Sequence, residues 1–447
     1  METPDIVVVG CGASGALLAG QLFRQATQVL QLSCVDSRFR LGAGLAYGSA
    51  RDEHLLNVPA SRMSALPDQP DHFANWLSQR RLTRESPTEY FAPRRQYADY
   101  LTDYLGESLR TSTLPHGVHH EPHRAVGLKP LHGGWLLNLD DGRQVWSKTV
   151  VLALGNLTPL SPPSGLHAVV EHPAYLHNPW SGSWPQLDAR ASVGIIGSGL
   201  TAVDQVLSLQ VAGHRGPIHV YSRGGEWPGV HVLGANPIDI GLRSGSLATV
   251  LRELRRGLAL GAGQGAVWQQ VIDGLRPHTA QIWQQFTEVE KRRFLRWLGS
   301  SWNRARHRMP PTVKDRLTQL EQSGQLTLGA APAIAGRPSG AMIEIDPGDG
   351  SEIRRVHMLL NCTGAGSRVT DSAQPLLGQL LEDGLIQPGP AELGLANDAD
   401  GRVVNRSGLP QQGLWTIGPM RQGSLWESTA IPEIRQQAAD LAERLLQ

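Results

Sequence analysis

The strongest constraint in this sequence is a short apolar run that ends in spaced glycines. Residues Ile6 to Val9 are all β-branched, which is typical of a strand buried on both faces of a parallel sheet. Gly10, Gly12 and Gly15 follow in the spacing GxGxxG, and a helix-forming stretch from Ala16 to Phe23 comes next. In this setting the glycines permit the turn, the approach of a pyrophosphate to the helix N-terminus, and close helix packing. The sequence therefore predicts a nucleotide-binding βαβ unit at its start.

The second strand of this unit ends in an acid. The strand is predicted over Val29 to Val35, and Asp36 follows it, 21 residues beyond Gly15. A carboxylate at this offset can accept hydrogen bonds from the ribose of an adenosine. We therefore expect a dinucleotide with an unmodified ribose in this unit.

A second copy of the pattern begins near the middle of the chain. The apolar strand Ser192 to Ile196 is followed by the spacing GxGxxA, which starts at Gly197, and then by a helix and another strand. Where the first unit has its acid, this copy has Arg223, preceded by Ser222. An arginine here favours a ribose 2′-phosphate, which a carboxylate would repel. NADPH is the expected second ligand, and an internal duplication with one inactive site is the alternative.

Two strands that end in glycine bracket this second unit. The run Val145 to Leu154 predicts a buried strand closed by Gly155, and Val356 to Leu360 predicts a similar strand that leads to Gly364. Both strand ends resemble the ATG-type motifs of two-dinucleotide flavoproteins. This resemblance implies an α/β protein with two Rossmann-like dinucleotide-binding domains, the NADPH domain being inserted into the FAD domain. The expected division is FAD-binding domain, first part, 1–188; NADPH-binding domain, 189–357; FAD-binding domain, second part, 358–447.

The stretch 245–325 departs from the α/β pattern and predicts a helical subdomain. The expected helices are Leu247 to Arg256, Val267 to Leu275, Ile282 to Leu298 and Val313 to Leu320. Four tryptophans in this stretch indicate either core packing or a lid over a substrate pocket: Trp268, Trp283, Trp297 and Trp302. A basic segment near its end predicts a solvated face or a site for an anionic substrate or phosphate: Arg304, Arg306, His307 and Arg308.

Composition argues against several other classes of protein. The 41 basic and 40 acidic residues leave a net charge of +1, so the basic surplus that binds nucleic acid is missing. The three cysteines form no CxxC pair, which disfavours disulfide-reductase chemistry and fits a reducing cytoplasm. No basic residue precedes the first apolar run and glycines interrupt it, so we expect neither a signal peptide nor a membrane span. Four histidines lie between 116 and 123, but Pro122 prevents a helical pair, and no metal is expected.

Several longer segments resemble one bacterial family of FAD/NAD(P)-binding proteins, to which FAD-dependent urate hydroxylase-like proteins belong. The matching segments are Gly42 to Gly48, His54 to Ala65, Phe91 to Leu101, Ser222 to His231, and Leu414 to Ala438. More remotely, the layout is similar to class B flavin monooxygenases, including the N-hydroxylases of amines. The resemblance implies FAD in the first site and NADPH in the second.

The resemblance also implies an activity. It is that of an NADPH-dependent flavoprotein monooxygenase, which reduces bound FAD, forms a C4a-(hydro)peroxyflavin with O2 and hydroxylates a small organic substrate such as an amine, an amino acid or a nitrogen heterocycle. Two alternatives stay open: an oxygen-independent FAD/NADPH oxidoreductase that passes electrons to a small molecule or protein partner, and a non-catalytic redox sensor. The expected location is the cytoplasm, without a membrane or nucleic-acid partner.

The motifs and the resemblance together give the candidate site residues. Asn57 is the candidate catalytic group on the flavin's reactive face, or else a turn residue before Pro59. Trp426 to Thr429 would open a helix whose N-terminal amides face the flavin, and Arg94 and Arg95 would grip the FAD pyrophosphate or a substrate acid, or lie on the surface. The expected FAD residues are Gly10, Gly12, Ala13, Ser14, Gly15, Asp36, Ser37, Tyr47, Asn57, Val126, Gly155, Gly364, Gly418, Pro419, Trp426, Glu427, Ser428 and Thr429. The expected NADPH residues are Gly197, Ser198, Gly199, Leu200, Thr201, Ala202, Ser222 and Arg223.

Overall fold

The computed structural model describes residues 3–447 apart from 39, 160, 182–183, 185–186 and 264–267. Its first sheet has six strands, in the spatial order β18 (Arg402–Val404), β19 (Pro410–Thr416), β7 (Thr149–Leu152), β1 (Ile6–Val9), β2 (Gln31–Val35) and β3 (Gly117–Glu121). Strand β1 pairs in parallel with β2 and β7, and Val9 lies opposite Val35. The carboxyl ends of β1 and β2, where the glycine turn and Asp36 lie, are therefore neighbours.

Both faces of the first sheet are covered, as its β-branched strand predicts. On one face Ile6 and Val8 pack with α1 (Ala13–Gln25), α4 (Arg94–Thr111) and α14 (Ile431–Leu445). On the other face Val7 and Val9 pack with a three-stranded antiparallel sheet and with α12 (Pro375–Glu382). The antiparallel strands are β4 (Ala125–Leu131), β5 (Gly134–Leu139) and β6 (Gln144–Ser147).

The second sheet has five strands, in the spatial order β12 (Leu326–Ala330), β11 (Ile218–Ser222), β10 (Val193–Ile196), β16 (Met358–Asn361) and β9 (Tyr175–Leu176). All of its pairings are parallel. Helices α5 (Leu200–Val211) and α11 (Pro311–Gln322) pack on one face. The other face carries the antiparallel strands β13 (Ala335–Ser339), β14 (Met342–Asp346) and β15 (Arg354–Val356).

Two strands of the second sheet lie outside the expected 189–357. Strand β9 precedes residue 189, and β16 follows residue 357. Both belong to the second sheet because β16 pairs with β10 and β9 pairs with β16. The chain thus enters this sheet at Tyr175 and leaves it after Asn361. The two connections between the sheets meet as β8 (Leu157–Pro159) and β17 (Ala365–Gly366), which pair antiparallel.

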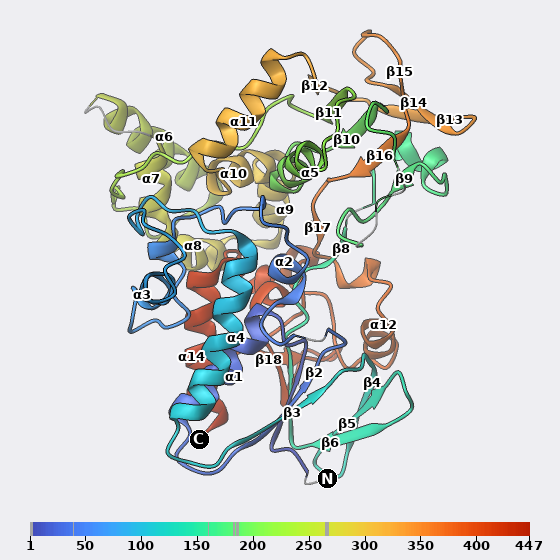
Figure 1. The fold of residues 1–447 in the computed structure, drawn as a ribbon. Coiled ribbons are helices and arrows are strands. Elements are labelled where there is room, and N and C mark those ends of the chain that lie inside the picture. The colour runs from blue at the N-terminus through green and yellow to red at the C-terminus, as the bar shows by residue number, and fades with distance from the viewer. Residues whose placement is uncertain (1–2, 39, 160, 182–183, 185–186, 264–267) are drawn as a thin grey trace.

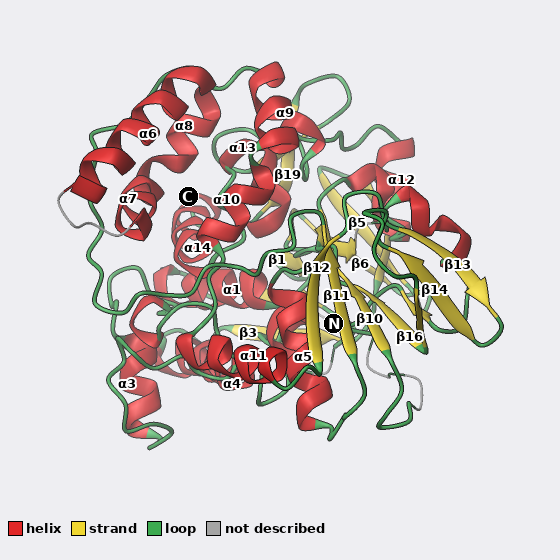
Figure 2. Cartoon of the chain, turned by 90° about the horizontal axis from the view of Figure 1, so that it is seen from above, coloured by secondary structure: helices red, strands yellow, loops and turns green. Residues whose placement is uncertain are grey.

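The helices between β11 and α11 form a separate group, here called the helical lobe (Figure 2). They are α6 (Leu247–Gly263), α7 (Trp268–Leu275), α8 (Thr279–Gln285), α9 (Glu288–Trp297) and α10 (Gly299–Arg306). The single helix predicted over Ile282 to Leu298 is wrong, because Thr287 and Glu290 form a capping box that starts α9. The helix predicted near Val313 exists as α11, but it packs on the second sheet instead of in the lobe.

The remaining described elements are short. The α-helices are α2 (Gly44–Gly48), α3 (His72–Gln79) and α13 (Gln422–Leu425), and the 3-10 segments are Ala60–Arg62, Ser164–Val169, Arg276–His278, Val369–Asp371, Pro390–Glu392 and Gly418–Arg421.

The described chain stacks these parts in two levels (Figure 1). The lower level contains the first sheet and both chain ends, and the upper level contains the second sheet beside the helical lobe. This arrangement confirms the predicted fold class, two Rossmann-type units with a helical subdomain. Among the described helices, none has the length and apolarity needed to cross a membrane.

Candidate cofactor and active site

The first glycine turn leaves the N-terminus of α1 open. Gly10 has φ +88°, and a Cβ on it would lie 2.6 Å from the Ala153 carbonyl oxygen. A Cβ on Gly15 would lie 2.3 Å from the Gly10 oxygen. Gly12 is the N-cap and has no side chain with which to cap the helix. The first amides of α1 therefore face outward, as anion binding at a helix N-terminus requires.

Asp36 is held beside this turn. Its carboxylate accepts the backbone N–H of Cys11 at 2.9 Å on one oxygen and that of Arg38 at 3.0 Å on the other. The residue is only 9% exposed. A fixed carboxylate next to open helix amides fits the ribose and the pyrophosphate of one adenine dinucleotide.

A cavity of about 310 Å³, here called the interdomain cavity, extends from this turn to the second sheet. Gly10, Gly12 and Asp36 line it from the first unit, and Thr201 at the start of α5 lines it from the second. Both glycine-rich units therefore border one space.

Ten of the residues predicted for the first site line the interdomain cavity. They are Gly10, Gly12, Ala13, Ser14, Asp36, Tyr47, Gly155, Gly364, Pro419 and Thr429. Gly15 and Gly418 do not line the cavity, but they allow close packing next to it. A Cβ on Gly418 would lie 2.4 Å from the hydroxyl oxygen of Ser14, which is a lining residue. The other predicted residues are not among the lining residues: Ser37, Asn57, Val126, Trp426, Glu427 and Ser428.

Sequence reasoning also missed part of the cavity wall. The missed residues include Arg38, Gly44, Asn156, Asn178, Trp180 and Asn361. Gly44 lies in the GAGLAYG motif, where only Tyr47 was selected, so the motif itself carried that signal. Asn156 lies on the connection between the two sheets, Asn178 and Trp180 follow β9, and Asn361 ends β16. No local spacing marks them.

The helix predicted to open at Trp426 is wrong. Helix α13 ends at Leu425, Trp426 has φ +61°, and α14 begins only at Ile431, with Pro432 in its first turn. Proline favours that position because it needs no N–H partner there. Residues 426–429 are instead a connecting segment, of which Thr429 reaches the interdomain cavity.

The structure gives Arg94 and Arg95 different ion-pair partners and places Tyr47 at the cavity wall. Arg94 lines the interdomain cavity, but its Nη1 pairs with the Asp204 carboxylate of α5 at 2.5 Å, so it joins the two domains. Arg95 is exposed and pairs with Asp52, which leaves it with the surface role. Burial raises the pKa of Tyr47 to about 12, so a neutral phenol stands at the cavity wall.

The second glycine turn repeats the geometry of the first. Gly197 has φ +99°, and a Cβ on it would lie 2.2 Å from the Cys362 carbonyl oxygen. Gly199 is the N-cap of α5. Arg223 is exposed beyond the end of β11, and its Nη2 donates to the Ser300 hydroxyl of α10 at 2.6 Å. The helical lobe thus contacts the residue predicted to select a 2′-phosphate.

Arg304 adds a second guanidinium at this edge. Its Nη1 lies 3.3 Å from the position of a Cβ on Gly224, next to Arg223, and it pairs with Glu226. Ser300 and Arg304 are one helical turn apart on α10, so both arginines flank the same loop.

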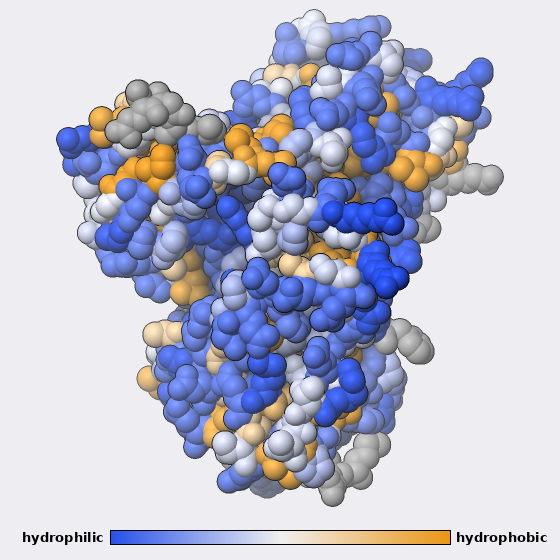
Figure 3. Space-filling view, turned by 60° about the vertical axis from the view of Figure 1, so that its left-hand side comes forward, coloured by the Kyte–Doolittle hydropathy of each residue, from blue (hydrophilic) through white to orange (hydrophobic). Residues whose placement is uncertain are grey.

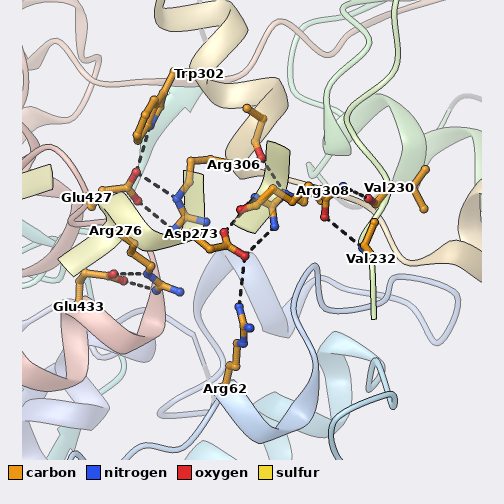
Figure 4. A network of polar contacts seen from close by, with 12 residues as sticks. Arg62, Val230, Val232, Asp273, Arg276, Trp302, Arg306, Arg308, Glu427 and Glu433 are labelled. Atoms are coloured by element: carbon orange, nitrogen blue, oxygen red, sulfur yellow. Dashed lines mark hydrogen bonds and ion pairs between the residues drawn. The ribbon is translucent and has the colours of Figure 1, made fainter. Parts of the chain in front are cut away.

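The solvated basic face predicted near the end of the lobe is wrong for two of its members (Figure 4). Arg306 is 7% exposed and pairs with Glu427 at 3.3 Å, and Arg308 is 2% exposed and forms a bidentate pair with Asp273 at 2.9 Å. Arg62 of the first domain also approaches Asp273, at 3.7 Å. The Arg306–Glu427 pair thus connects the helical lobe to the segment before α14, and the partly exposed Arg62 connects it to the first domain. The Arg308–Asp273 pair joins α7 to the segment after α10.

The four neighbouring histidines have separate partners. His116 accepts the Leu30 N–H, His120 contacts the Asp36 carbonyl at 2.9 Å, and His119 and His123 face different carboxylates. Within the described residues, no group of three or more His, Cys, Asp or Glu side chains is arranged to hold a metal ion.

We expect acid to destabilise the fold through His231. Burial, then Arg308 and Arg62, lower its pKa to about 4, while Asp273 acts in the opposite direction. The unfolded chain binds this proton near pH 6.5, so between pH 6.5 and 4 the unfolded state holds more protons and stability falls as the pH falls. At pH 5 the loss is about 2 kcal/mol relative to neutral pH.

Urea unfolding at pH 7 and pH 5 checks this. His231→Gln should lose less stability than the unchanged protein over this interval, whereas His167→Gln, at an exposed position, should follow the unchanged protein. Identical slopes for all three proteins would refute the prediction.

Two glycine-rich βαβ units that border one cavity, the first with an acid beyond its second strand and the second with an arginine, define a protein with two Rossmann-type dinucleotide-binding domains. Comparisons with known proteins agree. Residues 7–157 match the family model described as FAD-NAD(P)-binding. No curated protein sequence matches the chain significantly.

Solved structures share the complete fold. The ornithine N-hydroxylase of Kutzneria sp. 744, solved with reduced FAD, NADP+ and L-ornithine, is 16% identical, with 99% of each chain covered and a TM-score of 0.66. The cadaverine monooxygenase of Erwinia amylovora is 12% identical, with 100% of this chain and 95% of that chain covered and a TM-score of 0.66. The bacillithiol disulfide reductase of Staphylococcus aureus is 11% identical, with 100% and 99% covered and a TM-score of 0.57. The resemblance to N-hydroxylating flavin monooxygenases is thus confirmed for the fold, and the activity has to be argued from the site.

Proposed function

We propose that this chain is an NADPH-dependent FAD monooxygenase that hydroxylates a small organic substrate. The observation that carries the proposal is the interdomain cavity, which borders Asp36 and the start of α1 on one side and Thr201 of α5 on the other. A flavin and a nicotinamide held by these two units would share this one cavity. The overall reaction converts substrate, O2, NADPH and a proton into hydroxylated product, NADP+ and water.

The chain's own contribution is binding and orientation. Asp36 would accept the ribose hydroxyls of FAD, and the first amides of α1 would bind its pyrophosphate. Arg223 and Arg304 would bind the 2′-phosphate of NADPH. Bound FAD and NADPH supply the hydride transfer and the activation of oxygen.

Several expectations remain part of this proposal. They are an NADPH-binding domain inserted between two parts of an FAD-binding domain, the role of Asn57, the formation of a C4a-(hydro)peroxyflavin, the amine, amino acid or heterocycle class of substrate, and a cytoplasmic location. Two ion pairs favour a helical lobe that is fixed in place, as water exclusion during oxygen chemistry requires. Arg306–Glu427 joins the lobe to the segment before α14, and Arg62–Asp273 joins it to the first domain.

Arg223→Ala should raise the KM for NADPH about tenfold and leave that for NADH nearly unchanged. Removal of the exposed guanidinium would deprive the 2′-phosphate of one charge-assisted contact, worth about 1.5 kcal/mol. Steady-state oxidation of both nucleotides measures the effect, and Arg304→Ala should act in the same direction. Equal changes for NADPH and NADH would refute the 2′-phosphate assignment.

The reaction with oxygen separates the proposed activity from its main alternative. The NADPH-reduced protein is mixed rapidly with oxygenated buffer, and the flavin absorbance is followed. A species distinct from both reduced and oxidised flavin that persists over seconds supports a monooxygenase. Direct return to oxidised flavin, together with fast electron transfer to added quinones or disulfides, would favour an oxygen-independent oxidoreductase.

A further inference from the structure

The helical lobe contains a second cavity, here called the apolar cavity, of about 340 Å³. Helices α6 to α10 form its wall, together with one residue from the segment before α14. Its main side chains are Leu251, Leu254, Trp268, Ile272, Trp283 and Trp426. Among the described residues that line it, none is charged, and only Thr279 and Ser301 carry a hydroxyl.

Three of the polar groups in this wall already have hydrogen-bond partners. The indole N–H of Trp283 donates to the Gly423 carbonyl at 2.8 Å, and that of Trp302 donates to the Glu427 carboxylate at 3.1 Å. The Thr279 hydroxyl donates to the Arg276 carbonyl at 2.9 Å. The cavity therefore presents mostly carbon and the faces of aromatic rings.

This chemistry selects the kind of molecule that can enter. An ion or zwitterion would lose its hydration in the cavity and find no counter-charge among the described lining residues, which is unfavourable. Aromatic rings, in contrast, gain stacking and edge contacts with tryptophan faces. The volume lies at the lower end of the range of small-molecule sites, roughly 300–1,000 Å³. A neutral aromatic molecule of a few rings fits both the uncharged lining and the volume of the cavity.

One segment joins the apolar cavity to the interdomain cavity. Trp426 lines the first cavity and Thr429 lines the second. Trp426 has the unusual φ of +61° and stacks on Trp283 with ring centroids 4.7 Å apart. Between the two, Ser428 is fully buried, and its hydroxyl oxygen has no hydrogen-bond partner within the described structure. Strain and an unpaired buried hydroxyl at one place are typical of a functional site.

We propose that the apolar cavity is the substrate site and that the substrate is a neutral aromatic molecule, such as a nitrogen heterocycle or an aromatic amine that is uncharged at pH 7. This inference rests on the proposed monooxygenase function and narrows its substrate class. Charged amino acids, which the fold accommodates in other proteins, are disfavoured as substrates here.

The test uses N-phenyl-1-naphthylamine, an uncharged aromatic probe whose fluorescence rises in apolar surroundings. Leu254 lines the cavity and is half-buried, so Leu254→Asp places a carboxylate in the wall with little disturbance of α6. Leu260 lies on the same helix, is 59% exposed and is not among the lining residues. Leu260→Asp is therefore the matched control. It also detects any binding of the probe to the apolar outer surface of the lobe, which is seen beside the grey residues in Figure 3.

The probe should bind the FAD-loaded protein, and Leu254→Asp should weaken binding at least tenfold, whereas Leu260→Asp should change it less than twofold. Indole should displace the probe and L-ornithine should not. Equal binding in both variants, no binding at all, or displacement by L-ornithine would overturn the proposal. FAD content and bleaching by NADPH are measured on the same samples. A protein that binds the probe as expected but contains no FAD, or whose flavin is not bleached by NADPH, would overturn the proposed function. The ligand class inferred for the apolar cavity would still hold.

Discussion

Asp36→Ala is expected to weaken FAD binding about ten- to a hundredfold in a protein that still folds. The carboxylate is fixed by two backbone N–H groups and lines the interdomain cavity. Hydrogen bonds from ribose hydroxyls to such a charged acceptor contribute about 1.5–3 kcal/mol. The variant should be purified with little flavin, and titration of the apoprotein with FAD should give the raised Kd.

Asp5 provides a matched control at the opposite edge of the same sheet, because it precedes β1 whereas Asp36 follows the neighbouring parallel strand β2. Its carboxylate also accepts a backbone N–H, that of Gln31 at 2.8 Å, but it does not line the cavity. Asp5→Ala should keep a full complement of FAD. If Asp36→Ala retained as much flavin as Asp5→Ala, the assignment of FAD to the first unit would be wrong.

Asp273→Ala should lower the free energy of unfolding by about 3–5 kcal/mol. The substitution leaves the 2% exposed Arg308 without its carboxylate, and an uncompensated buried charge costs about this much. Burial opposes ionisation of Asp273, but hydrogen bonds and charge from Arg308, with Arg62, still lower its pKa, so the carboxylate is charged at neutral pH. Urea unfolding at pH 7 measures the loss.

Two comparison variants test the cause. Asp99 pairs with Arg40 at the surface at 2.6 Å, and Asp99→Ala should cost less than about 1 kcal/mol. The double variant Asp273→Leu/Arg308→Leu should recover much of the stability lost by Asp273→Ala, because it removes both charges. A double variant that is as unstable as the sum of the two single variants would show that the charges are not coupled.

The two nucleotide turns could be predicted from sequence because their signals are local. Strand β1 has the bounds predicted for it, and the spacing from Gly15 to Asp36 fixes the carboxylate next to the turn through the pairing of β1 with β2. Glycine is required at these turns by backbone contacts a few residues away, which a spacing motif encodes directly.

The rest of the site depends on contacts between distant segments. Arg306 and Arg308 look like members of an exposed basic run, and only the packing of α7, α10 and residues 426–429 buries them beside Asp273 and Glu427. Strand β16 lies outside the predicted second domain because a four-residue apolar strand gives no sign of which sheet it joins. Nothing in the local sequence around Trp426 indicates its positive φ or its stacking on Trp283, which lies more than 100 residues earlier in the chain.

The central claim is that FAD and NADPH meet in the interdomain cavity. The most direct measurement is anaerobic mixing of the FAD-loaded protein with NADPH while the flavin absorbance is recorded. We expect the bound flavin to be bleached in a single turnover, and more rapidly by NADPH than by NADH at equal concentration. A protein that binds FAD but whose flavin absorbance is unchanged by NADPH would contradict the claim.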